Sequence, residues 1–247
     1  MSQQSKVQIK EWVECEIWER GTLSEFRLCE GNTVSDVAKN ELAKILADLS
    51  SNTIDRMWVI VDGATYEKTS QNSRPSSPGN ILEVTTSDAW TYTGNYTAVL
   101  TGNSSRGSSD YYNSIALSLN LTSGSELILT VKWQFSGAAS GMHGNEICAS
   151  RLGGIGDDYD YPISSVSIYY GGVEQERKTA SCSVTNNTLK VTHADPFSGP
   201  QDIDEVLYLT SSPYNGAYPN YFDKFDGFTI SVEADQDVYF DAEFVFG

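Results

Sequence analysis

Two stretches of this chain share one pattern: residues 127–137 are LILTVKWQFSG and residues 238–247 are VYFDAEFVFG. In each stretch every second residue is apolar, which is typical of a β-strand with one buried face. The alternating residues correspond at a constant shift of 111 and end on aromatic side chains. We therefore predict a core strand that closes each half of the chain. Its members are Leu127, Leu129, Val131, Trp133 and Phe135, and Val238, Phe240, Ala242, Phe244 and Phe246.

Three further blocks recur in the same order. Residues 54–63 match residues 163–172 at a shift of 109, and V-T-x-x-D-x-aromatic occurs at 84–90 and again at 191–197. Residues 115–121 match residues 228–234 just before the closing strands. Alternating strands resemble one another in any β-sandwich, but four blocks in one order favour duplication. We predict a mainly β protein of two tandem, jelly-roll-like β-sandwich domains, residues 1–137 and 138–247.

The N-terminal segment differs from the repeats. Residues 7–30 predict a β-hairpin that turns at Arg20 and Gly21, and residues 34–49 predict one short amphipathic helix capped by Ser35. In the second half, residues 145–147 match residues 40–42 of that helix, but RLGGIGDD at 151–158 is glycine-rich. Because glycine disfavours helix, we expect no second long helix.

Composition restricts the partners. The 33 acidic and 16 basic residues give a net charge of -17, which repels phosphate backbones and anionic lipid, so we expect neither nucleic acid nor membrane as a partner. No apolar run is long enough for a signal peptide or a membrane span. Cys15, Cys29, Cys148 and Cys182 lack metal-site spacing, so free thiols are favoured, with a Cys15–Cys29 bridge as the alternative.

Catalytic and metal motifs are sparse. The two histidines, His143 and His193, have no second histidine at ligand spacing, and no G-x-S-x-G elbow occurs. The one candidate for calcium is the acidic loop with Asp157, Asp158 and Asp160; it lacks the alternating ligands of known calcium loops, so a solvated turn is the preferred interpretation. We expect no catalytic residues and no cofactor.

The aromatic residues are more informative. Among 14 tyrosines, several lie in loop-like segments and could form a contact surface with little loss of side-chain entropy. A subunit interface and sugar stacking both use such residues. The candidate contact residues are Tyr111, Tyr112, Tyr214, Tyr218 and Tyr221.

The opening organisation, a hairpin followed by EGNTVSDVAKNELAKILADLSSNTIDRMWVIVDG at 30–63, resembles virion proteins of tailed phages and archaeal viruses. In that group a glycine-asparagine turn, a short LAKLL helix and a strand ending in glycine introduce a β-sandwich that closes with a W-x-F strand. This chain has Ser-Asp-Val-Ala where the group's turn has Asn and Gly. The likeness covers about the first 137 residues. It is carried by Gly31, Asn32, Leu42, Ala43, Leu46, Gly63, Trp133 and Phe135.

The resemblance implies a non-enzymatic tail, baseplate, fibre or capsid-surface component, made in the host cytoplasm and built into the virion. Its partners would be other copies of itself and other virion proteins. One alternative is a carbohydrate-binding or adhesion module for a host-surface glycan, which would stack sugar on Trp58, Trp90 or loop tyrosines. The other is a glycosidase-like enzyme, which would need two close carboxylates.

Overall fold

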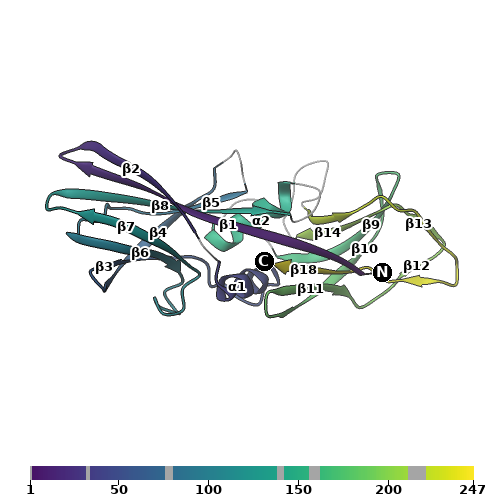
Figure 1. Ribbon diagram of the computed structural model, residues 1–247. Coiled ribbons are helices and arrows are strands. Elements are labelled where there is room, and N and C mark those ends of the chain that lie inside the picture. The colour runs from purple at the N-terminus through teal and green to yellow at the C-terminus, as the bar shows by residue number, and fades with distance from the viewer. Residues whose placement is uncertain (1, 32–33, 76–79, 138–141, 156–161, 211–220) are drawn as a thin grey trace.

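The computed structural model describes residues 2–31, 34–75, 80–137, 142–155, 162–210 and 221–247. The protein is mainly β, with 62% of its residues in strands and 9% in helices. Figure 1 shows an elongated molecule in which strands of the N-terminal half lie at one end, strands of the C-terminal half lie at the other, and the helices lie between them. In the described part, no helix has the length and apolar character needed to cross a membrane.

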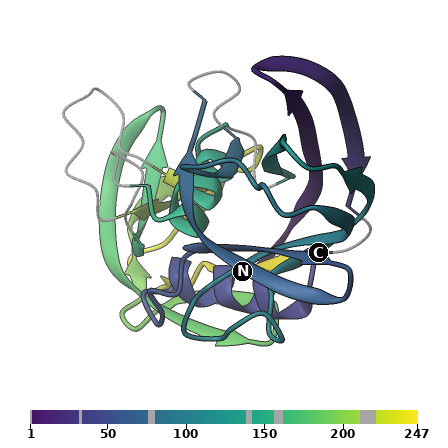
Figure 2. The same cartoon turned by 90° about the vertical axis from the view of Figure 1, so that its left-hand side faces the viewer.

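The predicted N-terminal hairpin is confirmed. Strand β1 (Ser2–Glu19) turns into β2 (Thr22–Glu30) through Arg20 and Gly21, which both have positive φ. Positive φ at both residues of a two-residue loop gives the turn a twist that matches the right-handed twist of the two strands. Figure 2 shows this hairpin at the rim of the curled sheet.

Six strands follow in the N-terminal half. They pair antiparallel in the order β7-β6-β3-β4-β5-β8, and β1 then pairs with β8. Alternate residues of β7 and β8 point inward, as the sequence pattern predicted. The strands are β3 (Arg56–Val61), β4 (Ala64–Ser73), β5 (Ile81–Thr86), β6 (Gly94–Gly102), β7 (Asn113–Leu121) and β8 (Ser125–Ser136).

The C-terminal half has the corresponding order, β15-β14-β9-β10-β11-β18. Two short antiparallel pairs, β12 with β17 and β13 with β16, complete it. The main strands are β9 (Ile163–Tyr170), β10 (Val173–Thr185), β11 (Thr188–His193), β14 (Glu205–Thr210), β15 (Tyr221–Phe225) and β18 (Asp241–Phe246). The short strands are β12 (Phe197–Ser198), β13 (Gln201–Ile203), β16 (Ile230–Val232) and β17 (Asp237–Val238).

Strand β1 joins both halves. Its first part pairs in parallel with β18, from Ser2 beside Asp241 to Val7 beside Phe246, and its second part pairs antiparallel with β8. One 14-stranded sheet therefore runs through the whole molecule, with β2 as an additional strand on β1. The sequence predicted the hairpin but not the parallel pairing with the last strand.

The predicted helix is present as α1 (Asp36–Leu46), and the Ser35 side chain accepts a hydrogen bond from the Ala38 amide. The expectation of a single helix was wrong, because α2 (Met142–Gly153) is as long as α1. Buried Ile147, Cys148, Ala149 and Leu152 anchor α2. The glycines terminate this helix instead of preventing it: Gly154, with φ of 60°, follows its last residue.

Helix α1 packs against strands of the opposite half, and α2 packs against strands of both halves. Helix α1 contacts β10, β11 and β18, whereas α2 contacts β5, β8 and β15. The Arg151 guanidinium of α2 donates a hydrogen bond to the Ile45 carbonyl of α1 at 2.5 Å. A single buried cluster extends through both halves, and its largest side chains are aromatic. They include Trp90, Trp133, Phe135, Phe197, Phe240, Phe244 and Phe246.

Candidate interaction site on the N-terminal hairpin

The two faces of β1 differ in chemistry. Its odd positions, such as Val13 and Cys15, are buried, whereas the even positions carry Trp12, Glu14, Glu16 and Trp18. Residues that oppose each other on antiparallel strands point to the same face. The partners of the even positions on β2 therefore lie on the outside of the sheet.

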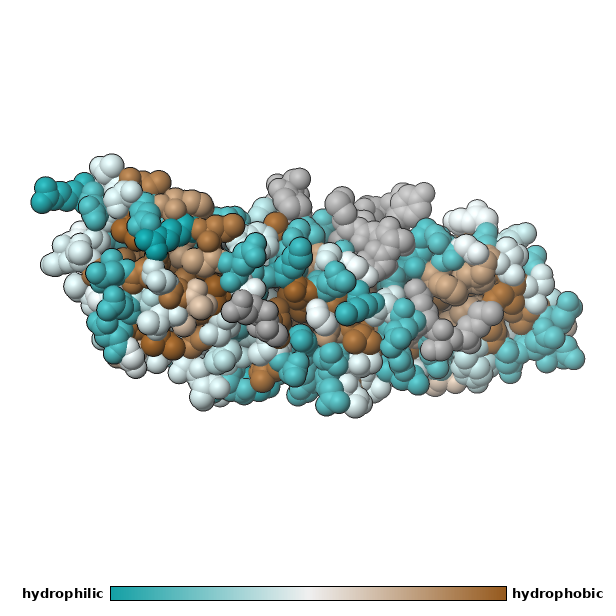
Figure 3. Space-filling model, in the orientation of Figure 1, coloured by the Kyte–Doolittle hydropathy of each residue, from teal (hydrophilic) through white to brown (hydrophobic). Residues whose placement is uncertain are grey.

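Large apolar side chains occupy that outer face. Leu23 pairs with Trp18, Phe26 with Glu16, and Leu28 with Glu14. These three are 44%, 54% and 56% exposed. Ile128 of β8, opposite Glu16 on the other side, is also exposed. Figure 3 shows the resulting apolar surface over β2 and β8. We call these four residues and the half-buried Trp12 and Trp18 the hairpin face.

A β-bulge produces this arrangement. Near the turn Leu23 opposes Trp18, but the register then shifts so that Ile17 opposes Glu25 and Ser24 is left over. A one-residue shift moves all the following side chains to the other face. Without the bulge, Phe26 would oppose Cys15 in the core. With it, Phe26 and Leu28 face outward and Glu25, Arg27 and Cys29 face inward.

The second edge of β2 has no strand paired to it among the described residues. The nearest strand across this edge is β7, and Arg27 Nη1 donates to the Ser118 carbonyl at 2.6 Å. The Arg27 side chain also pairs with Glu25 on its own strand. An edge strand with unpaired amides and carbonyls is a template for another strand.

Charged groups surround the hairpin face. Lys132 of β8 lies between Glu14 and Glu83, at 2.9 and 3.2 Å. The Trp18 indole donates to Glu16 at 3.0 Å. Glutamates therefore outnumber the basic groups here, in keeping with the net charge of the whole chain.

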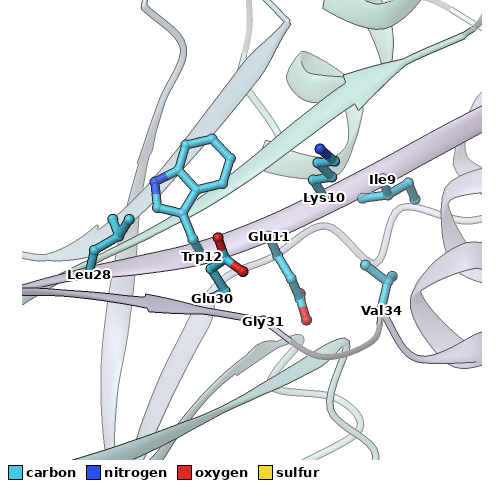
Figure 4. A pocket seen from close by; sticks show the side chains of 8 residues that line it. All are labelled: Ile9, Lys10, Glu11, Trp12, Leu28, Glu30, Gly31 and Val34. Atoms are coloured by element: carbon cyan, nitrogen blue, oxygen red, sulfur yellow. The ribbon is translucent and has the colours of Figure 1, made fainter.

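A pocket of about 370 Å³ opens beside the hairpin face. It arises because β18 ends beside Val7 and β2 ends beside Trp12, so the edge of β1 between them carries no strand in the described part of the chain. Figure 4 shows the side chains that line it. They are Ile9, Lys10, Glu11, Trp12, Leu28, Glu30, Gly31 and Val34.

Glu11 is the unusual residue of this pocket. It is only 6% exposed, and neither carboxyl oxygen meets a donor with hydrogen-bond geometry in the described structure. Burial raises the pKa of Glu11 to about 7, and the neighbouring Asn113 amide lowers it in part. A Cβ at position 31 would overlap the Glu11 side chain, which explains the glycine there. The carboxyl is therefore largely neutral at pH 6.

Glu11 and Glu30 do not form a catalytic pair. Glu11 occupies an inward, odd position of β1, whereas Glu30 opposes Trp12 and so belongs to the outer face. Figure 4 shows the two carboxyls on different sides of the strand. Glycosidase chemistry needs two carboxyls directed at one bond.

The predicted tyrosines do not gather in one surface. Tyr112 is fully buried, and its hydroxyl donates to the Asn52 carbonyl at 2.5 Å, so it belongs to the core. Half-buried Tyr111 lies in the same loop, and its carbonyl accepts from Ser35. Tyr221 packs on a separate cluster of Tyr169, Leu207 and Leu209. Tyr214 and Tyr218 lie outside the described residues. Trp58 and Trp90, the expected sugar-stacking rings, are buried.

The candidate calcium ligands Asp157, Asp158 and Asp160 also lie outside the described residues. Within the described ones, no group of three or more acidic, histidine or cysteine side chains could hold a metal ion. The four cysteines are free thiols.

His193 has a structural role. It is buried, its Nε2 accepts from the Phe240 amide at 3.0 Å, and its Nδ1 lies 2.7 Å from the Asp195 carbonyl. Since Nε2 accepts, the proton is on Nδ1. The Nε2 contact therefore joins β11 to the segment before β18, and the Nδ1 contact holds the turn that follows β11.

No protein-family model, curated protein or solved structure matches this chain. The hairpin face is thus interpreted from its own chemistry. The sequence contained one signal for it, the alternation of Phe26 and Leu28, but the side of the sheet to which they belong depends on the bulge at Ser24.

Proposed function

We propose that this protein is a non-enzymatic structural subunit of a virus particle that acts through contacts with other copies and other particle proteins. The observation that carries the proposal is the hairpin face: exposed Leu23, Phe26 and Leu28 on a strand whose second edge pairs with no strand in the described part of the chain. Contiguous exposed apolar side chains on a soluble domain mark sites of protein contact. The rim of glutamates limits premature association in a chain with charge -17.

The virion assignment rests on the resemblance of the first 137 residues to virion proteins. Two of the residues that carry it, Trp133 and Phe135, are fully buried in β8, the strand that closes the N-terminal half. Gly31 lies where the chain leaves the hairpin and passes over Glu11. These positions support the proposal because they give the shared motif a structural role.

We also propose that the two halves are duplicated β-sandwich domains. The equal strand order supports this. So do two matching bridges, Trp90 with Leu127 and Phe197 with Val238, whose members correspond in the sequence repeat. In each half a lysine lies over the bridging aromatic ring: Lys68 Nζ is 5.0 Å from the Trp90 ring and Lys178 Nζ is 5.8 Å from the Phe197 ring.

The glycan alternative has less support. Sugar stacking needs an exposed aromatic face, whereas Trp58 and Trp90 are enclosed. Trp58 also donates its indole N–H to Glu67 at 2.7 Å, so its polar atom is already used. The hairpin face joins four exposed apolar residues, three aliphatic side chains and Phe26, to the half-buried rings of Trp12 and Trp18, and this mixed apolar surface suits a protein partner better.

The test is the mass of the purified protein in solution, measured by light scattering after size exclusion at low and high salt. We expect association that increases with salt, because salt screens repulsion between acidic copies. The double variant Phe26→Ser with Leu28→Ser should reduce the mass to that of the monomer. Val173→Ser, at an exposed apolar residue on the far half, is the matched control and should assemble like the parent. A parent that stays monomeric at every salt concentration would refute self-assembly.

A further inference from the structure

We propose that β2 binds β2 of a second copy of this chain as an antiparallel pair, with a two-fold axis at Phe26. The inference rests on the proposed structural function and specifies the surface through which the copies meet. Its basis is that β2 can match a second β2 in three respects: the edge without a described partner strand, the exposed apolar residues and the charges.

The backbone supplies the first argument. Eight of the nine residues of β2 pair with β1 on one side, Ser24 being left over at the bulge, and no described strand uses the amides and carbonyls on the other. Two-fold pairing of edge strands satisfies these groups in both copies at once. The same surface of each copy then forms the interface, so the contact closes as a dimer and does not propagate.

Side-chain parity limits the registers. In an antiparallel pair, opposed residues share a face, so outward Phe26 and Leu28 must oppose outward residues and inward Glu25 and Arg27 must oppose inward ones. If a two-fold axis relates the two strands, the residue at the axis must therefore oppose its own copy. Past the bulge at Ser24, an axis at Glu25 would oppose two glutamates, which their like charge excludes, so the candidates near the middle of the strand are Phe26, Arg27 and Leu28.

Charge selects among these three. An axis at Phe26 places Glu25 of each copy opposite Arg27 of the other, so two ion pairs form. An axis at Arg27 would oppose two Arg27 side chains, and like charges directly opposite destabilise a sheet. An axis at Leu28 would place Phe26 against Glu30. Within one chain Glu25 and Arg27 already form an exposed ion pair, which can be exchanged between copies at little cost.

The outer face gains apolar contact in the same register. Phe26 of one copy opposes Phe26 of the other, and Leu23 and Leu28 of both copies lie on the same side of the joined sheet. All three are about half exposed in the single chain. Cross-strand aromatic pairs stabilise a sheet beyond the area that they bury.

The charge selection can be tested by exchange. In Glu25→Arg, two arginines would oppose each other across the axis twice, and in Arg27→Glu, two glutamates would do so. We expect each single variant to dissociate with a Kd raised on the order of tenfold or more. An equimolar mixture of the two variants should dimerise as the parent does, since every opposed pair is then of opposite charge. The double variant Glu25→Arg with Arg27→Glu should also regain the dimer.

Sedimentation equilibrium at moderate salt measures the masses, and circular dichroism melting shows that each variant is folded. Arg27→Glu also loses the bond to Ser118, but Glu25→Arg keeps it, so the mixture separates this effect from the interface. If the single variants form the parent's oligomer unchanged, or the mixture stays monomeric, this interface is refuted while the proposed function stands. A parent that is monomeric at every salt concentration refutes both and leaves the edge of β2 to a different chain.

Discussion

The Ser5 hydroxyl donates a 2.9 Å hydrogen bond to Oδ2 of Asp223, which joins the first strand of the chain to β15 near the opposite terminus. Asp223 is fully buried, and burial raises its pKa to about 6 even though Ser5 and the Lys224 amide donate to it. The N-terminal part of β1 is thus a component of the C-terminal half, both through this bond and through its pairing with β18.

Ser5→Ala should make the stability of the protein more dependent on pH. Asp223 has a higher pKa in the fold than its ordinary value of 3.8, so its ionisation destabilises the fold and stability falls as pH rises through about 6. Loss of the hydroxyl removes a donor that favours the ionised form. We expect a loss of about 2 kcal/mol at pH 8 and a smaller loss at pH 4, measured by urea unfolding. An equal loss at both pH values would show that the bond to the carboxylate is not the cause.

Removal of residues 2–7 should affect the distant half more than the near one. Without them β18 loses its parallel partner, whereas β3 keeps β4 and β6 on its two sides. Hydrogen exchange should therefore accelerate in residues 241–246 and change little in residues 56–61. Uniform acceleration would mean that the sheet unfolds as one unit, and no change in 241–246 would mean that the parallel pairing contributes nothing.

The sequence predicted the mainly β class, the hairpin, α1 and the closing strands, because each has a local period or a local turn signal. It could not predict the side to which Phe26 and Leu28 point. The turn at Arg20 and Gly21 alone would place them in the core, and a single extra residue, Ser24, reverses this. Such a bulge depends on packing around the strand and not on a residue pattern.

Helix α2 was missed for a related reason. Its glycines lower its intrinsic helix propensity, but Ile147, Cys148, Ala149 and Leu152 bury one face against both halves. Tertiary burial outweighs a propensity difference of about 1 kcal/mol per glycine. Likewise, the sequence could not distinguish Glu11 from the many other acidic residues. Its burial depends on where β2 and β18 end along one edge of β1.

Arg106→Met should be strongly destabilising. Arg106 pairs with Glu41, whose side chain is almost fully buried in α1, and with Asp110. Ser50 and Asn52 also donate to Glu41, but the variant leaves its charge without a cation. We expect a loss of roughly 3 kcal/mol in the free energy of unfolding, partly recovered by adding Glu41→Gln. Arg56→Met, at the exposed pair with Glu67, is the control and should cost under about 1 kcal/mol.

Lys68→Met and Lys178→Met should have similar effects if the halves are duplicates. Each ammonium lies over a buried aromatic ring. The Trp90 ring belongs to the residue that bridges to Leu127 near the start of β8, and the Phe197 ring to the residue that bridges to Val238 just before β18. We expect losses of about 1 kcal/mol for each, since each ammonium also has polar partners: Lys68 donates to the Asp88 and Ala89 carbonyls, and Lys178 pairs with Glu176 at 2.6 Å. Thermal unfolding of both variants measures this. A loss in one half alone would show that the two contacts are not equivalent.

Glu11→Gln should stabilise the protein above neutral pH. The pKa of Glu11 is about 7 in the fold against an ordinary value of 4.5, so the parent has its full stability below about 4.5 and loses it progressively as pH rises through 7. This difference corresponds to on the order of 3 kcal/mol between pH 4 and pH 9. Glutamine is neutral throughout, so the variant should lack this part of the pH dependence while keeping the part due to Asp223.

Because Glu11 lines the pocket beside the hairpin face but lies on the inner side of β1, the variant should dimerise like the parent. Urea unfolding at pH 5 and pH 8 measures the first effect, and sedimentation at the same two values measures the second. If Glu11→Gln loses as much stability as the parent between these pH values, the carboxyl is not the buried, ionisation-resistant group that the geometry of the pocket requires.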